Sequence, residues 1–406
     1  MRMQKRLGIA TLLAILAGLC APALVGRETR QPRWSENLSS YGYSLQHPYS
    51  DVAVAASNDN VAVALNVSQD PNATASLPAG FLRSNWKLSL LMFNASSGKF
   101  RTACGPWFGS ILFNLWSTSD GNFLLYQEPQ QVTREKTSGR VLLLSPSCQV
   151  LKKIQLPALG KQGGIEFLIS PTQRTFLIAE QSGRLTECQV QDANTLLERF
   201  KKSIDPDDPR VVAVSDEGLL GVKPMHSGSS TRAPVRFFYF TFQAQAWSEI
   251  PGPNLPDAPD SVTFASNGAF METVATGSSG AWAKTGIRIS IRGIDGTAAF
   301  STAISRRNIN IAPGSPFAVS PTGNYFGVVL SSYSVSSFWR FFDMSPRHDE
   351  VYIWSRHSEK PLVQIGVRSG SLHQQLAFAP DDSWFALRNG KMLVVRPLQR
   401  PPIPNR

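Results

Sequence analysis

The ionisable side chains that could perform catalysis are scattered along this chain of 406 residues. The histidines are His47, His226, His348, His357 and His373. Histidines of this kind, in predicted surface loops, are more often solvated side chains than metal ligands or general bases. The acids Asp205, Asp207 and Asp208 alternate with prolines. That pattern indicates a rigid polar loop, not two glycosidase carboxylates facing each other across a pocket.

Short catalytic motifs add nothing to this inventory. The sequence has no G-x-S-x-G, no H-E-x-x-H, no EF-hand loop, no phosphate-binding glycine loop and no dinucleotide fingerprint. Residues Ser117 to Gly121 approach the sialidase box but lack its downstream threonine and tryptophan. We therefore predict no catalytic residue, no metal site and no cofactor.

The residues best suited to binding are aromatic and lie in one segment, 331–349 (SSYSVSSFWRFFDMSPRHD). Aromatic side chains beside arginine are typical of interaction hot spots, and an exposed apolar cluster requires an explanation. We predict that a partner is contacted by Tyr333, Phe338, Trp339, Arg340, Phe341, Phe342, Arg347 and His348. The alternative is that the segment plugs the ring or extends its flanking strands, which would bury these rings.

Basic side chains accompany this segment in other predicted loops, at Arg134, Arg232 and Lys284. Together with a formal net charge of +11, they predict an anionic partner, such as an envelope polysaccharide or an acidic protein. The alternative is an ordinary solvated surface. Nucleic acid is disfavoured, because the sequence predicts export and contains no nucleic-acid-binding motif.

The elements that must position these residues are short strands separated by tight turns. The clearest example is SPFAVSPTGNYFGVVL, Ser315 to Leu330, in which Ser320-Pro321-Thr322-Gly323 separates two apolar runs. Degraded copies of this turn begin at Ser57, Thr118, Ser170, Ser215, Ala265 and Ala379. A repeat of about 50 residues is typical of a propeller blade.

Each repeat contains two strands around this turn and then a third and a fourth strand. The third strands are predicted at residues 87–93, 140–145, 184–190, 236–242, 287–294, 350–354 and 391–396. No segment has a sustained helical period. The sequence therefore predicts an all-β fold, a seven-bladed β-propeller of four-stranded antiparallel blades.

The repeated turns resemble those of WD40-like propellers of the bacterial cell envelope, such as the periplasmic propeller of the Tol-Pal system. Those blades carry a phrase like F-S-P-D-G-K, and the closest matches here are Val319 to Gly323 and Phe378 to Asp382. The Gly-His and Trp-Asp pairs of true WD40 repeats are absent. The resemblance implies a seven-bladed scaffold for protein or ligand contact and transfers no catalytic residue.

The last repeat lacks a fourth strand, because the chain becomes proline-rich after Arg396. An open blade would expose unpaired backbone groups. The isolated strand-like segment Trp34 to Leu45 is predicted to complete this blade and close the ring. The alternative is that it only packs across the rim.

Strand direction alternates within a blade, so the connections between second and third strands open on one face of the ring, and both short turns open on the other. The long connections are predicted at residues 68–85, 127–139, 223–234, 276–286 and 331–349. Long loops on a rigid scaffold commonly carry recognition. We call this the long-loop face and the opposite one the short-turn face.

The N-terminus has a basic head, an apolar run from Leu7 to Gly26 and the small-x-small site Ala21-Pro22-Ala23. This pattern predicts a signal peptide over 1–23 and export to the periplasm or the exterior. The run could instead stay as a membrane anchor, or Cys20 could be lipidated. The other boundaries are a linker at 24–32, one propeller at 33–398 and a tail at 399–406.

The three cysteines that follow the signal segment are Cys104, Cys148 and Cys188. No Cys-x-x-Cys pair occurs, so neither zinc nor redox chemistry is indicated. An oxidising compartment allows one disulfide and leaves one thiol; the alternative is three small buried apolar side chains.

Three functions fit these features. The first is an exported, monomeric, non-catalytic scaffold that binds a protein or an anionic polymer through the long-loop face. The second is a propeller enzyme, a hydrolase or lyase on sugars or lactones, with its site in the central funnel. The third is a structural module without a partner surface. Converging carboxylates, or a histidine beside a carboxylate, would favour the enzyme.

Overall fold

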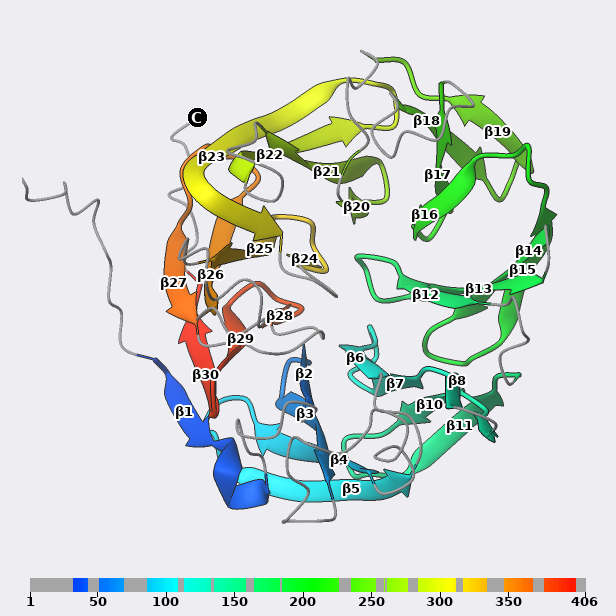
Figure 1. Cartoon of the computed structure of the whole chain (residues 1–406). Helices are drawn as coiled ribbons and strands as arrows, with labels where there is room; N and C mark the ends of the chain where they lie inside the picture. Colours follow the sequence, from blue (N-terminus) through cyan, green and yellow to red (C-terminus); the bar gives the residue numbers. More distant parts are fainter. Residues whose placement is uncertain are drawn as a thin grey trace, which may run out of the picture. The chain divides into compact units, whose positions relative to one another are not determined.

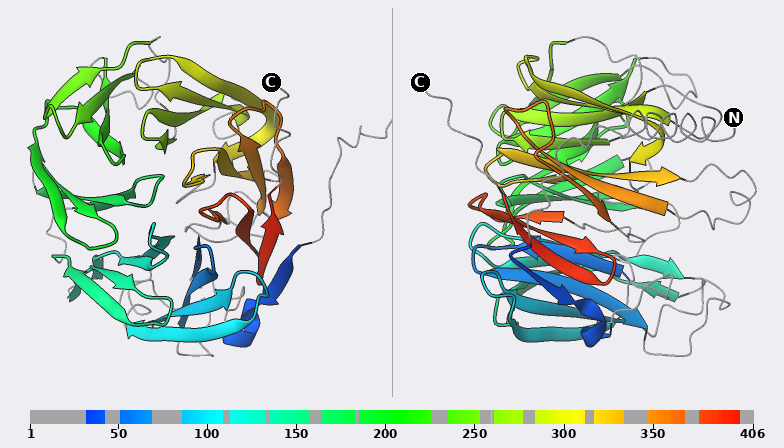
Figure 2. Two further views of the ribbon diagram at one scale, coloured as in Figure 1. Left: turned by 180° about the vertical axis from the view of Figure 1, so that it is seen from behind. Right: turned by 90° about the vertical axis from the view of Figure 1, so that its left-hand side faces the viewer.

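In the computed structural model, the described residues are 32–42, 51–68, 86–108, 113–132, 135–157, 164–182, 185–225, 235–252, 259, 261–276, 284–311, 317–333, 347–367 and 376–398. Seven four-stranded antiparallel blades form a ring (Figure 1). The predicted all-β propeller fold is confirmed. Figure 2 shows the ring from behind and from the side. Within these ranges, no helix is long and apolar enough to cross a membrane.

The first four blades follow the chain in order, each from its inner to its outer strand. Blade 1 contains β2 (Asp51–Ala56), β3 (Asn60–Ser68), β4 (Trp86–Asn94) and β5 (Phe100–Phe108). Blade 2 contains β6 (Phe113–Ser117), β7 (Phe123–Gln127), β10 (Arg140–Leu144) and β11 (Val150–Gln155). Blade 3 contains β12 (Ile165–Ile169), β13 (Thr175–Ser182), β14 (Leu185–Asp192) and β15 (Glu198–Ile204). Blade 4 contains β16 (Arg210–Val214), β17 (Gly218–Pro224), β18 (Val235–Thr241) and β19 (Ala246–Glu249).

The remaining three blades complete the ring. Blade 5 contains β20 (Ser261–Ser266), β21 (Ala269–Thr276), β22 (Lys284–Gly293) and β23 (Ala298–Ile311). Blade 6 contains β24 (Phe317–Val319), β25 (Tyr325–Tyr333), β26 (Arg347–Ser355) and β27 (Val363–Val367). Blade 7 contains β28 (Leu376–Phe378), β29 (Trp384–Asn389), β30 (Met392–Pro397) and, as its outer strand, β1 (Trp34–Asn37). A 3₁₀ turn, Leu38–Tyr41, follows β1.

The core is divided into seven apolar clusters, one between each pair of neighbouring blades. The sequence VAVAA-SNDN-VAVAL of β2 and β3 shows how this division arises. Because successive strand residues point to opposite faces, Val54 and Val63 pack toward blade 7, whereas Ala55 and Ala64 pack toward blade 2. The alanines leave room for larger side chains of blade 2, including Phe113 and Phe123.

Strand β1 closes the ring, as the sequence predicts. It pairs antiparallel with β30, from Trp34 opposite Val395 to Asn37 opposite Met392. Leu38 is fully buried in the cluster between blades 7 and 1. The indole Nε1 of Trp34 donates a 2.8 Å hydrogen bond to the carbonyl of Ala95 in blade 1. The N-terminal strand therefore bonds to the last blade and packs against the first.

A disulfide joins blades 1 and 2. Cys104 of β5 is bonded to Cys148, which lies in the turn before β11, and their Cα atoms are 5.0 Å apart. Cys188 is a free and buried cysteine. Burial is the main reason that the pKa of its thiol is raised to about 12. Of the two alternatives from the sequence, the structure therefore has one bridge and one inert thiol.

Candidate functional site

Blades 5 and 6 are joined at the long-loop face, where their strands form one eight-stranded sheet. Strand β23 pairs along β22 and then continues to β25, with Ile309 opposite Ser332 and Ile311 opposite Leu330. The short inner strand β24 pairs with residues 326–328 of β25. The end of β23 pairs with residues 330–332, so it continues the inner side of β25 toward the long-loop face.

This sheet brings four of the predicted binding residues to one edge. Lys284 begins β22 and is opposite Ile309 of β23, which in turn is opposite Ser332 of β25. Ser332 is opposite His348 of β26, and the next pair is Tyr333 with Arg347. Neighbouring strands are about 4.8 Å apart, so three strand spacings separate the backbones of Lys284 and His348 by roughly 14 Å.

The predicted recognition loop is shorter than the sequence indicates. Residues 331–333 and 347–349 belong to β25 and β26, so Tyr333, Arg347 and His348 lie on strands instead of in the connection. The sequence alternative in which this segment extends its flanking strands is thus realised in part. The other predicted residues lie outside the described ranges: Phe338, Trp339, Arg340, Phe341, Phe342, Arg134 and Arg232.

A second extension of the long-loop face comes from blade 2. Its connection between second and third strands contains a small hairpin, β8 (Gln130–Val132) and β9 (Glu135–Thr137), with Val132 opposite Glu135. Regular strand pairing therefore occupies part of the predicted connection 127–139, as it does part of 331–349.

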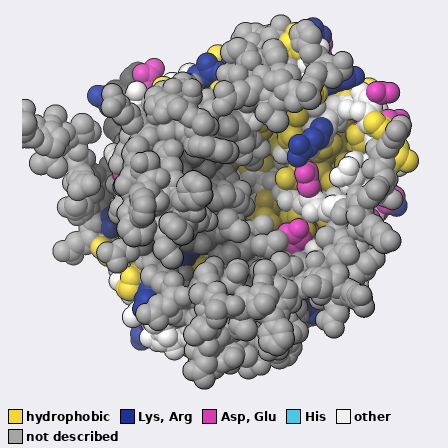
Figure 3. Space-filling view, viewed as in Figure 1, with side chains coloured by type: hydrophobic (Ala, Val, Ile, Leu, Met, Phe, Trp, Pro, Cys, Tyr) yellow, Lys and Arg dark blue, Asp and Glu magenta, His cyan; other side chains and the backbone are white. Residues whose placement is uncertain are grey.

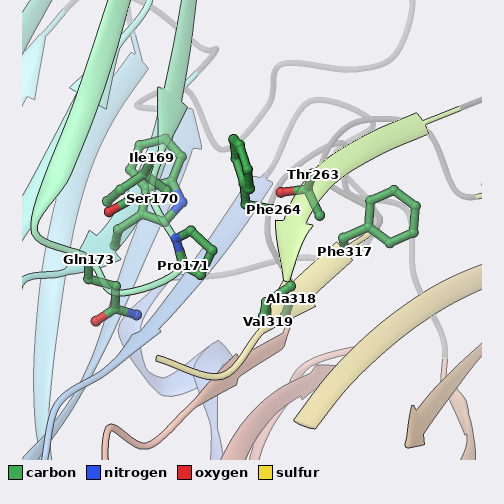
Figure 4. Close-up of a pocket in the computed structure, with 10 residues that line it drawn as sticks. Ile169, Ser170, Pro171, Gln173, Thr263, Phe264, Phe317, Ala318 and Val319 are labelled. Atoms are coloured by element: carbon green, nitrogen blue, oxygen red, sulfur yellow. The ribbon is translucent and has the colours of Figure 1, made fainter. Parts of the chain in front are cut away.

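The central channel contains a pocket formed by inner strands. Trp116 of β6, Ile169 of β12, Phe264 of β20 and Phe317 of β24 line it, together with Pro171. Figure 4 shows Ile169 and Pro171 on one side and Phe264, Phe317 and Val319 on the other. The polar lining consists of Ser170, Gln173 and Thr263. The described lining is thus partly apolar and partly polar, and none of its residues has an ionisable side chain that could act as an acid or a base.

Two of the inner strands are joined by an ion pair. Arg210 of β16 and Glu166 of β12 are 3.0 Å apart, and both side chains are exposed. Figure 3 shows basic and acidic side chains on the wall of the central hollow, among hydrophobic ones. Within the described ranges, no group of three histidine, cysteine or acidic side chains could hold a metal ion.

The acids at 205–208 form the rigid polar turn that the sequence predicts. The backbone N–H of Asp208 donates to the carbonyl of Asp205, and Lys223 Nζ donates a 2.7 Å bond to the carbonyl of Asp207. All three carboxylates lie in this blade link. They therefore do not face one another across the channel.

The repeated serine turn, which the sequence singles out, has a structural task on the short-turn face. The buried Ser170 hydroxyl accepts the backbone N–H of Thr175 and lies 3.0 Å from the hydroxyl of Thr172. Thr172 in turn donates to both carboxylate oxygens of Asp216 in the next blade, at 2.8 and 2.7 Å. The turn thus stabilises itself and bonds to its neighbour.

The same link recurs between blades 6 and 7. Thr322 donates to Asp382, and Asn324 donates a 3.1 Å bond to the same carboxylate. Between blades 2 and 3, Ser117 donates to Gln173 at 2.7 Å. Sequence reasoning found the motif but not these bonds, because they join side chains about 50 residues apart.

Comparisons with known proteins agree on the fold. No protein-family model and no curated protein matches the chain. The crystal structure of RRP9 WD40 repeats aligns with a TM-score of 0.51 at 10% identity, covering 91% of this chain and 99% of that one. The structure of U3-55K aligns with a TM-score of 0.49 at 11% identity, covering 90% of this chain and 98% of that one.

At 10% identity, the similarity to the RRP9 WD40 repeats shows the fold alone. The protein is thus an all-β, seven-bladed propeller of WD40-like architecture. The part of the predicted resemblance that concerns architecture is confirmed. Its bacterial and envelope character stays a prediction.

Proposed function

We propose that this protein is an exported, non-catalytic scaffold that binds a protein or an anionic polymer through its long-loop face. The observation that carries the proposal is the eight-stranded sheet across blades 5 and 6. Its edge holds Lys284, Tyr333, Arg347 and His348 on neighbouring strands, and the aromatic segment 334–346 is attached there.

A fixed sheet edge favours recognition for a physical reason. The two ends of the aromatic segment are held by consecutive backbone pairs, Tyr333 with Arg347 and Ser332 with His348. A loop whose ends are already ordered loses less conformational entropy on binding than one with free ends. Basic residues at this edge suit an anionic partner.

Export is supported by the Cys104–Cys148 bridge in addition to the N-terminal sequence pattern. Structural disulfides persist in oxidising compartments and are rare in the cytosol of most organisms. The enzyme alternative gains no support from the channel pocket, because the described residues of its lining have no ionisable side chain.

The test is capture of a partner from envelope extract by the predicted mature chain, Leu24–Arg406. The double variant Trp339→Ala/Phe342→Ala should lose capture, because aromatic anchors commonly dominate binding energy. Its melting temperature should stay within about 2 °C of the parent value, as expected for exposed side chains. A matched control is Leu185→Ser, since Leu185 is 48% exposed and lies outside the aromatic segment. Capture that survives in the double variant would contradict the proposal, and a large fall in its melting temperature would show that the rings belong to the core.

A further inference from the structure

Exposed apolar side chains gather on the short-turn face of blades 1 to 3. Of the five large hydrophobic side chains that are exposed in the described part of the chain, four lie at or directly before the starts of the outer strands of three consecutive blades. They are Phe100 of β5 (45% exposed), Val150 and Leu151 of β11 (51% and 45%) and Leu197, directly before β15 (60%). We call these four residues the rim patch.

Two links join neighbouring blades beside the rim patch. The Cys104–Cys148 disulfide fixes the turn before Val150 against β5. The second turn of blade 3 is bonded to the first turn of blade 2, because Asn194 Nδ2 donates to Ser119 Oγ at 2.9 Å. These links hold the three strand starts in place, so the patch is preorganised for contact.

Basic side chains flank the rim patch. Lys99, Arg101, Lys152, Lys153 and Arg199 are exposed at or beside the same strand starts. The nearby exposed acids are Glu198 on β15, and Asp59 and Asp120 in the first turns of blades 1 and 2. Basic side chains around exposed apolar ones are the composition of surfaces that bind anionic bilayers, where apolar groups enter the interface and cations contact the headgroups.

The chain also enters the propeller at this face. Trp34, the first residue of β1, bonds to Ala95 in the second turn of blade 1, which precedes Phe100 by only a few residues. Strand β1 therefore begins on the same face of the propeller as the rim patch.

We propose that the rim patch docks on an anionic lipid bilayer and thereby turns the long-loop face away from the membrane. The inference is separate from partner binding at the long-loop face, and its test does not depend on a partner. The test uses Leu24–Arg406, which lacks the apolar run. This form contains the whole propeller, because the compact unit with every described strand begins at Pro32.

The measurement is co-sedimentation with vesicles of phosphatidylcholine and phosphatidylglycerol (7:3) and with phosphatidylcholine alone. The protein should bind the anionic vesicles only, and 0.5 M NaCl should weaken binding by about tenfold, because salt screens the basic side chains. The variant Val150→Ser/Leu197→Ser should lower partitioning by about tenfold or more. Phe100 is left unchanged because its ring packs on Tyr41 and Phe93, at 5.3 and 5.9 Å.

The matched control is Leu185→Ser. Leu185 is 48% exposed but begins β14, at the long-loop end of blade 3. Partitioning of this control should change less than about twofold. Absence of binding to the anionic vesicles, or an equal loss in the control, would overturn the proposal. So would a dimer in light scattering that the double variant abolishes, because the patch would then bind a second copy.

Discussion

Single residues on the short-turn face explain why one phrase recurs along the chain. A buried serine satisfies backbone groups of its own turn, as Ser215 does when it accepts the N–H of Gly218 at 3.0 Å. In two of the turns, a threonine two residues later bonds to the adjacent blade, as Thr172 does to Asp216 and Thr322 does to Asp382. The motif therefore has a structural role, because its hydrogen bonds stabilise the turn and the contact between adjacent blades.

A buried ion pair in blade 5 gives a residue-scale prediction. Glu272 of β21 is 1% exposed and accepts a 3.0 Å bond from Arg292 Nε of β22. Arg292→Ala should destabilise the fold by about 3–5 kcal/mol, because it leaves a buried carboxylate without its cation. Urea unfolding measures this change.

The control for that prediction is an exposed pair of the same type. Arg236 and Glu249 are 3.4 Å apart, with side chains about half exposed. Arg236→Ala should change stability by less than about 1 kcal/mol. If both substitutions lowered the free energy of unfolding equally, the buried Glu272–Arg292 pair would stabilise the fold no more than the exposed pair does.

The cysteines give a second prediction at this scale. In the mature chain, Ellman's reagent should find no reactive thiol in the native state, because the Cys188 thiol is buried and its pKa is raised to about 12. One thiol should appear in denaturant without reductant and three after reduction. Three thiols before reduction would mean that Cys104 and Cys148 are not bonded.

Residue roles were predictable from the sequence only where a role is local. The acidic turn at 205–208 follows from its prolines, and the serine turns follow from their composition. The pairing of Cys104 with Cys148 does not, because it depends on how blades 1 and 2 are placed side by side. The Glu272–Arg292 pair also escaped prediction, since neither residue lies in a motif.

For some strands, the alternation of residues in the sequence is enough to predict which side chains face each neighbouring blade. The alternation of valine and alanine in β2 and β3 already assigns one side of blade 1 to larger side chains and the other to small ones. Strand β23 is different. Its 14 residues serve blade 5 and then pair with β25 of blade 6. That crossing was not predicted, because a repeat-based alignment assumes that each strand belongs to one blade.

Strand β1 and its 3₁₀ turn carry an element-scale prediction. Leu38 is fully buried between blades 7 and 1. Leu38→Ala should destabilise the propeller by about 2–5 kcal/mol, as expected for truncation of a buried leucine. The exposed Ser40→Ala control should change stability by less than about 0.5 kcal/mol. If chemical denaturation gave the same free energy of unfolding for both variants, the packing of Leu38 after β1 would not stabilise the closed ring.

The molecule as a whole presents two different faces. On one, short turns are bonded from blade to blade, as in the Thr172–Asp216 link, and an apolar rim with basic side chains extends over blades 1 to 3. On the other, strand extensions from blades 2, 5 and 6 carry the long connections. The blade number and the ring closure were predictable because each repeat is a local pattern, whereas the joining of blades 5 and 6 depends on tertiary pairing.

The most direct test of the proposed binding face is site-specific photo-crosslinking in envelope extract. Benzoylphenylalanine would replace Tyr333 at the end of β25 in one variant, and Leu197 on the opposite face in another. The account predicts a protein or polymer adduct from position 333 that unlabelled parent protein competes away, and no such adduct from position 197. A competed adduct from position 197 alone would contradict it.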